Sequence, residues 1–245
     1  FVFLFVLFGA LLDKAGAGEY FIKVSYTILG KYDGGPAKAA VAASGMFGMI
    51  SGSSIANTVT VGTFTIPLMK RLGFSAHKAA AVETAASVNG QLMPPIMGAA
   101  AFIMAEFLGL NYTDIVFAAF IPAFTCYFAL FYIVHLEAKK NGLKGEDASV
   151  LGRTWPIFIR GIHYLIPIFF LIYTLIVLRQ SAQSAAFSAI MFLMVIIVKQ
   201  KPFKAYLNKE KITLPLILEG FSDISNGMVM GAKNMVSIAV ATAVA

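Results

Sequence analysis

The sequence predicts an all-α polytopic membrane protein. Of its 245 residues, 59% are hydrophobic and only 13% are charged, and the mean hydropathy is +0.81. A soluble domain would carry about 25% charged residues. The apolar residues form runs of helical length instead of alternating ten-residue segments, which argues against an outer-membrane-type barrel. We therefore expect a helical bundle embedded in a lipid bilayer.

Basic residues outnumber acidic ones, 19 to 12, and most of them lie in short loops between the apolar runs. Such a distribution indicates membrane topology and does not predict a nucleic-acid partner. The lysine-rich loops at 135–154 and 199–211 are separated by two predicted spans, so both are expected on the cytoplasmic side. The single cysteine, Cys126, lies inside a predicted span, and one cysteine excludes an intrachain disulfide.

The predicted elements cross the membrane several times. In chain order they are the end of a transmembrane helix at 1–12, an interfacial arm helix and turn at 19–34, interrupted segments at 36–70 and 75–108, and transmembrane helices at 112–134, 155–178, 185–198 and 219–245. The chain begins and ends inside apolar runs. We therefore expect an internal fragment of a longer protein, with the last helix truncated.

The first interrupted segment, 36–70, is broken by the polar tetrapeptide Ser51-Gly52-Ser53-Ser54. As one continuous helix it would be about 52 Å long, whereas the hydrocarbon core is only about 30 Å thick. The length favours a re-entrant hairpin, with arms at 36–50 and 55–70 that open to the cytoplasm and a polar tip at depth. The alternative is one kinked helix whose small residues pack against neighbouring helices.

The second interrupted segment, 75–108, contains Asn89-Gly90-Gln91 and then Pro94-Pro95. Two successive prolines remove two backbone donors and leave carbonyls of the preceding turn without partners. The segment is therefore expected to be a discontinuous helix that resumes at Ile96. We expect the unpaired carbonyls to be available as ligands.

Both breaks lie inside apolar sequence, where irregular backbone is tolerated only if it is buried in protein or lines a water-filled cavity. They therefore predict a binding site near the membrane midplane. Hydroxyl, amide and carbonyl oxygens there would bind a dehydrated cation such as sodium, and half-helix N-termini at 54–57 and 95–97 would favour an anionic substrate. The candidate residues are Ser51, Gly52, Ser53, Ser54, Asn57 and Thr58 at the tip, and Asn89, Gly90, Gln91, Met93, Pro94 and Pro95 at the break. Alternatively, these groups merely cap the helix ends.

Two acidic residues, Glu83 and Glu106, lie within or near apolar helix and are candidate ionisable ligands, although both are close enough to a helix end to reach water instead. The three histidines lie near span ends without metal-site spacing, and the serines of the tip do not form a nucleophile elbow. We therefore expect no catalytic residue, no metal beyond sodium and no organic cofactor.

Taken together, the two breaks resemble a known family. The stretch from Ile50 to Ser54 followed by Gly62, the helix exit at 67–71, and residues 89–98 resemble the large membrane subunit of the tripartite ATP-independent periplasmic (TRAP) transporters. Residues 90–102 look most like the type in which the small and large subunits are fused. The resemblance is dense from about residue 3 to 110 and mainly topological from there to residue 245.

The resemblance implies a permease of the ion-transporter type, with inverted repeats and an elevator-like movement, in the inner membrane. It implies sodium-coupled import of a small organic acid, a carboxylate, delivered by an extracytoplasmic substrate-binding protein. A small four-helix membrane subunit, fused or separate, is a further implied partner. The tip at 51–57 and the break at 89–95 would be the sodium-binding elements of the first repeat. The second repeat would follow residue 245, so this part alone is not expected to transport.

Three other functions remain open from the residues alone. A stand-alone sodium/dicarboxylate symporter of similar architecture would work without a binding protein. An intramembrane enzyme would need a nucleophile and a base at depth, where the sequence offers only serines. A channel with re-entrant loops would not show saturable, sodium-dependent uptake.

Overall fold

The computed structural model describes residues 2–94, 96–147, 151–207 and 214–244. Within these residues every regular element is a helix, as the sequence predicts. The helices divide into two compact units. Unit 1 contains the chain up to Ala17 and from Ile162 onward, and unit 2 contains Gly18 to Gly161.

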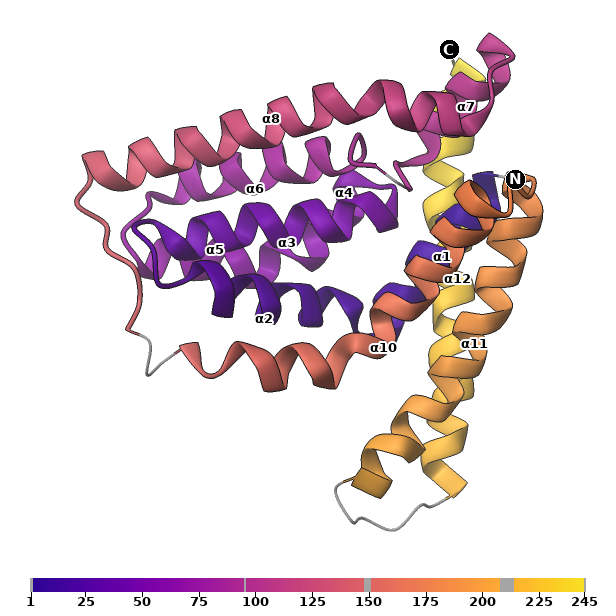
Figure 1. The fold of residues 1–245 in the computed structure, drawn as a ribbon. Helices are drawn as coiled ribbons and strands as arrows, with labels where there is room; N and C mark the ends of the chain where they lie inside the picture. Colours follow the sequence, from indigo (N-terminus) through magenta and orange to yellow (C-terminus); the bar gives the residue numbers. More distant parts are fainter. Residues whose placement is uncertain (1, 95, 148–150, 208–213, 245) are drawn as a thin grey trace. The chain divides into compact units, whose positions relative to one another are not determined.

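Unit 2 contains the two predicted breaks. Its helices are α2 (Ala17–Leu29), α3 (Gly35–Ser51), α4 (Ser54–Thr60), α5 (Gly62–Arg71), α6 (Ala76–Gly90), α7 (Ala99–Leu108), α8 (Tyr112–Lys140) and the first part of α10 (Thr154–Ile172). Both α4 and α5 pack against α3, so the chain folds back on itself after α3 (Figure 1). The α6 helix packs against all three of these helices and against α8. The interrupted segments therefore form one packed group.

The second arm of the folded-back segment differs from the single helix expected over 55–70. It consists of α4 and α5, which meet at Val61. At the junction the amide of Phe64 donates to the carbonyl of Val61, three residues back, at 3.0 Å, so the helical hydrogen bonding tightens locally. Gly62 follows, and a Cβ atom there would lie 3.1 Å from Cγ of Glu83. The junction therefore brings this arm close to α6.

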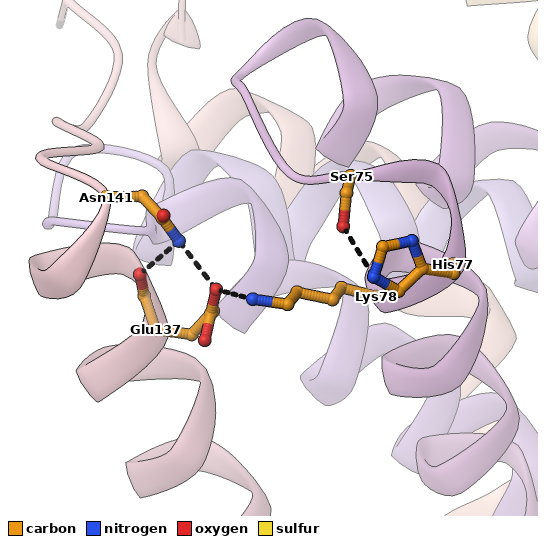
Figure 2. A network of polar contacts seen from close by, with 5 residues as sticks. All are labelled: Ser75, His77, Lys78, Glu137 and Asn141. Carbon is orange, nitrogen blue, oxygen red and sulfur yellow. Dashed lines mark hydrogen bonds and ion pairs between the residues drawn. The ribbon is translucent and has the colours of Figure 1, made fainter.

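The α8 helix is longer than expected and ends at Lys140 instead of Val134. Its polar last turns are held by α3 and α6. Nζ of Lys38 lies 3.1 Å from Nδ1 of His135, which must be the acceptor because an ammonium group only donates. Lys78 of α6 forms an ion pair with Glu137, whose carbonyl also accepts from Nδ2 of Asn141 at 2.8 Å (Figure 2). These contacts allow polar residues to continue the helix.

The turn after α8 packs against the connection between α2 and α3. The amide of Glu146 donates to the carbonyl of Gly30 at 2.9 Å, and the hydroxyl of Tyr26 donates to the carboxylate of Glu146. The amide of Gly34 donates to the carbonyl of Leu143 at 3.3 Å. The polar ends of α2, α3, α6 and α8 therefore meet at one end of unit 2.

Unit 1 is built around α1 (Val2–Ala15), α11 (Ala182–Leu207) and α12 (Leu214–Val244), together with the rest of α10 and the π-helical turn η1 (Tyr173–Val177). The α11 helix was expected at 185–198 and the α12 helix at 219–245, and both extend further into the stretch between them. Residues 208–213 of that stretch lie outside the described residues. The α1 helix packs against α12 and α11. Among the described residues of both units, three helical stretches are long and apolar enough to cross a membrane: Tyr112–Lys140, Thr154–Val177 and Ala182–Pro202.

Glycines allow close helix packing in unit 1. A Cβ atom on Gly227 would lie 3.2 Å from Cα of Leu11, and one on Gly231 would lie 3.1 Å from Cα of Leu7. The two glycines are four residues apart and therefore lie on one face of α12. Small residues at this spacing let two helix backbones approach, which is how helices associate in lipid.

We expect Gly161→Ala to destabilise unit 2. A Cβ atom at this position would lie 2.0 Å from Cδ2 of Tyr20, whose hydroxyl donates to the carbonyl of Phe158 at 3.1 Å. Forcing a methyl group into a packed site costs about 1–3 kcal/mol, which thermal unfolding of the purified protein would measure. In a Tyr20→Ala background the same substitution should cost much less, because the ring is absent. Equal costs in both backgrounds would contradict the steric explanation.

Candidate functional site

The chain reverses direction at a tip of only two residues, Gly52 and Ser53. Gly52 has φ 64°, a left-handed conformation that glycine adopts at little cost, and its amide donates to the carbonyl of Gly48 at 3.3 Å. Oγ of Ser53 accepts from the amide of Ala56 at 3.2 Å, so this hydroxyl caps α4. The capping interpretation therefore holds for Ser53.

The break between α6 and α7 covers residues 91–98 and is a series of tight turns. The amide of Gly98 donates to the carbonyl of Gln91 at 2.8 Å, which ties the two ends of the break together. Met97, with φ 52°, is one of two non-glycine residues with positive φ in the described part of the chain. Helix resumes at Ala99 rather than Ile96, because Met97 and Gly98 are not helical. Pro95 lies outside the described residues.

The expectation of unpaired carbonyls at this break is wrong for the turn before the prolines. The carbonyls of Asn89, Gly90 and Gln91 accept from the amides of Leu92, Met93 and Gly98, respectively, at 2.8–3.1 Å. The turns replace the helical hydrogen bonds that the prolines remove. Because each carbonyl oxygen has two lone pairs, these oxygens keep one acceptor site each.

The structure brings the tip and the break together through glycines. A Cβ atom on Gly48 would lie 2.8 Å from Cα of Gly90, and one on Gly90 would lie 2.8 Å from Cα of Gly48. Further along, a Cβ atom on Gly98 would lie 3.1 Å from the carbonyl oxygen of Gly52. The end of α3 therefore contacts the break, backbone against backbone, at two places.

Asn57 is the best candidate ligand at this junction. Its side chain is completely buried, and Nδ2 donates to the carbonyl of Ser44 at 2.9 Å. Within the described part of the chain, its Oδ1 is buried and has no hydrogen-bond partner. A Cβ atom on Gly48 would lie 2.9 Å from Nδ2, which places the amide beside the contact with Gly90. A buried acceptor without a partner is costly unless a ligand occupies it.

The other predicted tip residues differ in burial. Ser51 is buried, and its hydroxyl donates weakly to the carbonyl of Ser53 at 3.5 Å. Gly52, Ser54 and Thr58 are half-buried at the surface of the tip. The α4 helix has only seven residues, so the expected anion site at its N-terminus has little helix dipole behind it.

On the break, Asn89, Gln91 and Pro94 are half-buried and Gly90 is buried. Met93 packs against the apolar core of unit 2, which indicates a structural role for its side chain. The expected anion site at 95–97 does not coincide with a helix start, because α7 begins at Ala99.

Glu83 lies on α6, one turn before Ser87, and its carboxyl group is completely buried. Oε1 accepts from the hydroxyls of Ser44 and Ser87, the latter at 3.3 Å, and Oε2 lies 2.5 Å from the hydroxyl of Thr65. Glu83 therefore does not reach water, which was one of the two expectations for it, the other being a role as an ionisable ligand. Glu106 lies on α7, but its side chain is outside the described part of the structure.

Sequence reasoning missed the partners Ser44, Thr65 and Ser87. Ser87 follows Glu83 by four residues and so shares its helix face, a signal that the sequence contains. Ser44 and Thr65 are 39 and 18 residues away from Glu83, and only folding brings them together.

Comparison with known proteins supports a single family. The family model of the tripartite ATP-independent periplasmic transporter, DctM component, matches residues 1–245. The C4-dicarboxylate TRAP transporter large permease protein DctM of Rhodobacter capsulatus is 34% identical, over 37% of this chain and 21% of that protein. The sialic acid TRAP transporter permease protein SiaT of Haemophilus influenzae is 28% identical, over 56% of this chain and 22% of that protein.

A third relative is the 2,3-diketo-L-gulonate TRAP transporter large permease protein YiaN of Escherichia coli, which is 22% identical over 64% of this chain and 37% of that protein. The matched regions thus span between 21% and 37% of the length of these three relatives. Since the family model covers every residue, including both helix breaks, the chain belongs to the DctM component family of the tripartite ATP-independent periplasmic transporters.

Proposed function

We propose that this chain forms the first half of the transport site in a sodium-coupled, binding-protein-dependent permease that imports a small organic acid. Members of the DctM family are transporters and not enzymes, which removes the intramembrane enzyme from consideration. The names of the three relatives mention a C4-dicarboxylate, sialic acid and 2,3-diketo-L-gulonate, all of them organic acids with a carboxylate. We propose carboxylate uptake for this chain because it is similar to these three proteins.

The observation that carries the sodium proposal is the orphaned Oδ1 of Asn57. Oδ1 is buried without a partner among the described residues, and Nδ2 of the same amide lies beside the contact between the backbones of Gly48 and Gly90. Sodium is a hard cation that binds neutral oxygens of this kind, and a site of neutral ligands releases the ion more easily than one that contains a carboxylate. We propose that the ion lies between Asn57 and the break at 89–91, and that the hydroxyl oxygens of Ser51 and Thr58 are further ligands.

We further propose that the folded-back segment α3–α5 is re-entrant and opens to the cytoplasm. Its arms measure about 26 Å for α3 and about 27 Å for α4 and α5 together, each shorter than the hydrocarbon core. Lys70 and Arg71 end the second arm, and Lys38 lies in the second turn of the first. Both ends of the segment therefore carry positive charge, as cytoplasmic ends do.

Asn57→Ala should weaken sodium binding about tenfold, which corresponds to about 1.4 kcal/mol, because it removes the orphaned oxygen. The complete protein, purified in detergent, would be titrated with sodium chloride against choline chloride while its thermal unfolding is followed. Ser54→Ala should have a smaller effect, because Ser54 is only half-buried.

Thr63→Ala is the matched control for both substitutions. Its hydroxyl is exposed on the same arm and donates only to the carbonyl of Thr60, at 2.8 Å. Sodium stabilisation should be unchanged in this variant. An unchanged sodium titration in Asn57→Ala would remove Asn57 from the site, and the absence of sodium stabilisation in the unmodified protein would refute sodium coupling.

Uptake by proteoliposomes tests the whole assembly. Reconstituted with the small subunit, the complete permease should take up a radiolabelled organic acid only when its binding protein and an inward sodium gradient are both present. Uptake without the binding protein would instead identify a stand-alone symporter. Uptake that does not saturate with substrate would identify a channel.

Cysteine labelling tests the topology. In a Cys126→Ser background, Gly142→Cys should react with a membrane-impermeant maleimide only in inverted vesicles. Asn111→Cys, at the opposite end of α8, should react only in right-side-out vesicles. Both positions are exposed in the structure. The reverse pattern would place the opening of α3–α5 on the outer side of the membrane.

A further inference from the structure

The carboxyl group of Glu83 connects both arms of the folded-back segment to α6. Ser44 reaches it from α3 and Thr65 from α5, while Ser87 reaches it from the next turn of α6. All three hydroxyl-bearing side chains are fully or almost fully buried. Because Gly62 lacks a Cβ atom, the backbone of α5 also packs against the stem of Glu83. No other carboxyl group in the described part of the chain has such an environment.

No described cation neutralises this carboxyl group. Within the described residues, no Lys, Arg or His nitrogen lies within 4.0 Å of it. Tyr127 of α8 donates its hydroxyl to the carbonyl of Ala86 at 2.8 Å. The basic groups on the helices packed around Glu83 lie at helix ends or in other contacts. Lys38 contacts His135 and Lys78 contacts Glu137, while the exposed basic residues are Lys70, Arg71, His77, Lys139 and Lys140. A buried carboxylate without a cation is strongly disfavoured.

The number of hydrogen atoms available around Glu83 also indicates that its carboxyl group is protonated. The Thr65 hydroxyl has one hydrogen but lies near two acceptors, the carbonyl of Val61 at 3.1 Å and Oε2 of Glu83 at 2.5 Å. Threonine in a helix commonly donates to the carbonyl four residues back. If Thr65 does so, the short contact to Oε2 needs a hydrogen from Glu83. The hydroxyls of Ser44 and Ser87 then donate to Oε1, and each oxygen of the carboxyl group has a partner.

We propose that Glu83 is a buried proton-binding site: a neutral carboxylic acid that donates from Oε2 to Thr65, accepts at Oε1 from Ser44 and Ser87, and thereby holds both arms of the α3–α5 segment against α6. The ligand of this site is the proton itself. Glu83 does not contact the proposed cation and acts as a positioning residue.

The positioning acts on Asn57 through Ser44. The side chain of Ser44 donates to Glu83, and its carbonyl accepts from Nδ2 of Asn57 at 2.9 Å. Fixing Nδ2 in this way leaves Oδ1 of Asn57 as the end of the amide that has no partner among the described residues. This step rests on the proposed function, whereas the protonation of Glu83 does not.

Infrared spectroscopy tests the proton directly. The complete purified protein at neutral pH should show the carbonyl stretch of a protonated carboxylic acid. This band should be missing from the spectrum of the Glu83→Gln variant. Absence of that band in the unmodified protein would overturn the proposal. This readout does not depend on sodium, so it remains decisive even if sodium coupling is refuted.

Substitution tests the positioning role. Glutamine reproduces the neutral pattern, since its Nε2 donates to Thr65 and its Oε1 accepts from both serines. Glu83→Gln should therefore keep the midpoint of the sodium titration within about threefold of the unmodified value, whereas Glu83→Ala should raise it at least tenfold. Ser44→Ala should raise it as well, and Ser75→Ala, an exposed serine outside this network, should not.

Two results would overturn the positioning role. A tenfold loss of sodium affinity in Glu83→Gln would show that a negative charge is required at this position. A sodium titration that is unchanged in Glu83→Ala, measured on folded protein, would show that Glu83 does not position the site.

Discussion

The contact between Gly48 and Gly90 is the constraint on which the candidate site depends. Neither position has room for a Cβ atom, because a Cβ atom added to either glycine would lie 2.8 Å from the Cα atom of the other. The α3 and α6 helices therefore meet backbone to backbone just before both of them end. Two interruptions, one after Ser51 and one after Gly90, consequently lie next to each other.

Glycine contacts serve the same purpose in both units. In lipid, helices gain little from burying apolar side chains against one another, so close backbone packing must supply the attraction. In unit 1, Gly227 and Gly231 bring α12 onto α1. In unit 2, Gly48, Gly90 and Gly98 bring the tip onto the break. The difference is that the second set of contacts joins helix ends, where backbone oxygens and polar side chains are concentrated.

Several buried polar groups in this region have hydrogen-bond partners, and one buried oxygen does not. Turns between residues 91 and 98 satisfy the carbonyls that the prolines would have left unpaired. Ser53 caps α4, and hydroxyls surround the carboxyl group of Glu83. Oδ1 of Asn57 is buried at the junction without a hydrogen-bond partner among the described residues. A buried oxygen left open at this junction is suited to bind a ligand there.

The sequence by itself determined the all-α class, the existence of both interruptions and the polar residues that they contain. These follow from local chemistry, because glycine and proline interrupt a helix wherever they occur in such clusters. Only the tertiary structure decided which oxygens have partners, where α8 and α7 begin or end, and that Glu83 joins Ser44 and Thr65. The contacts of Glu83 with Ser44 and Thr65 join residues 39 and 18 positions apart, and the contacts of Lys38 and Lys78 with α8 join residues 97 and 59 positions apart, which no local pattern encodes.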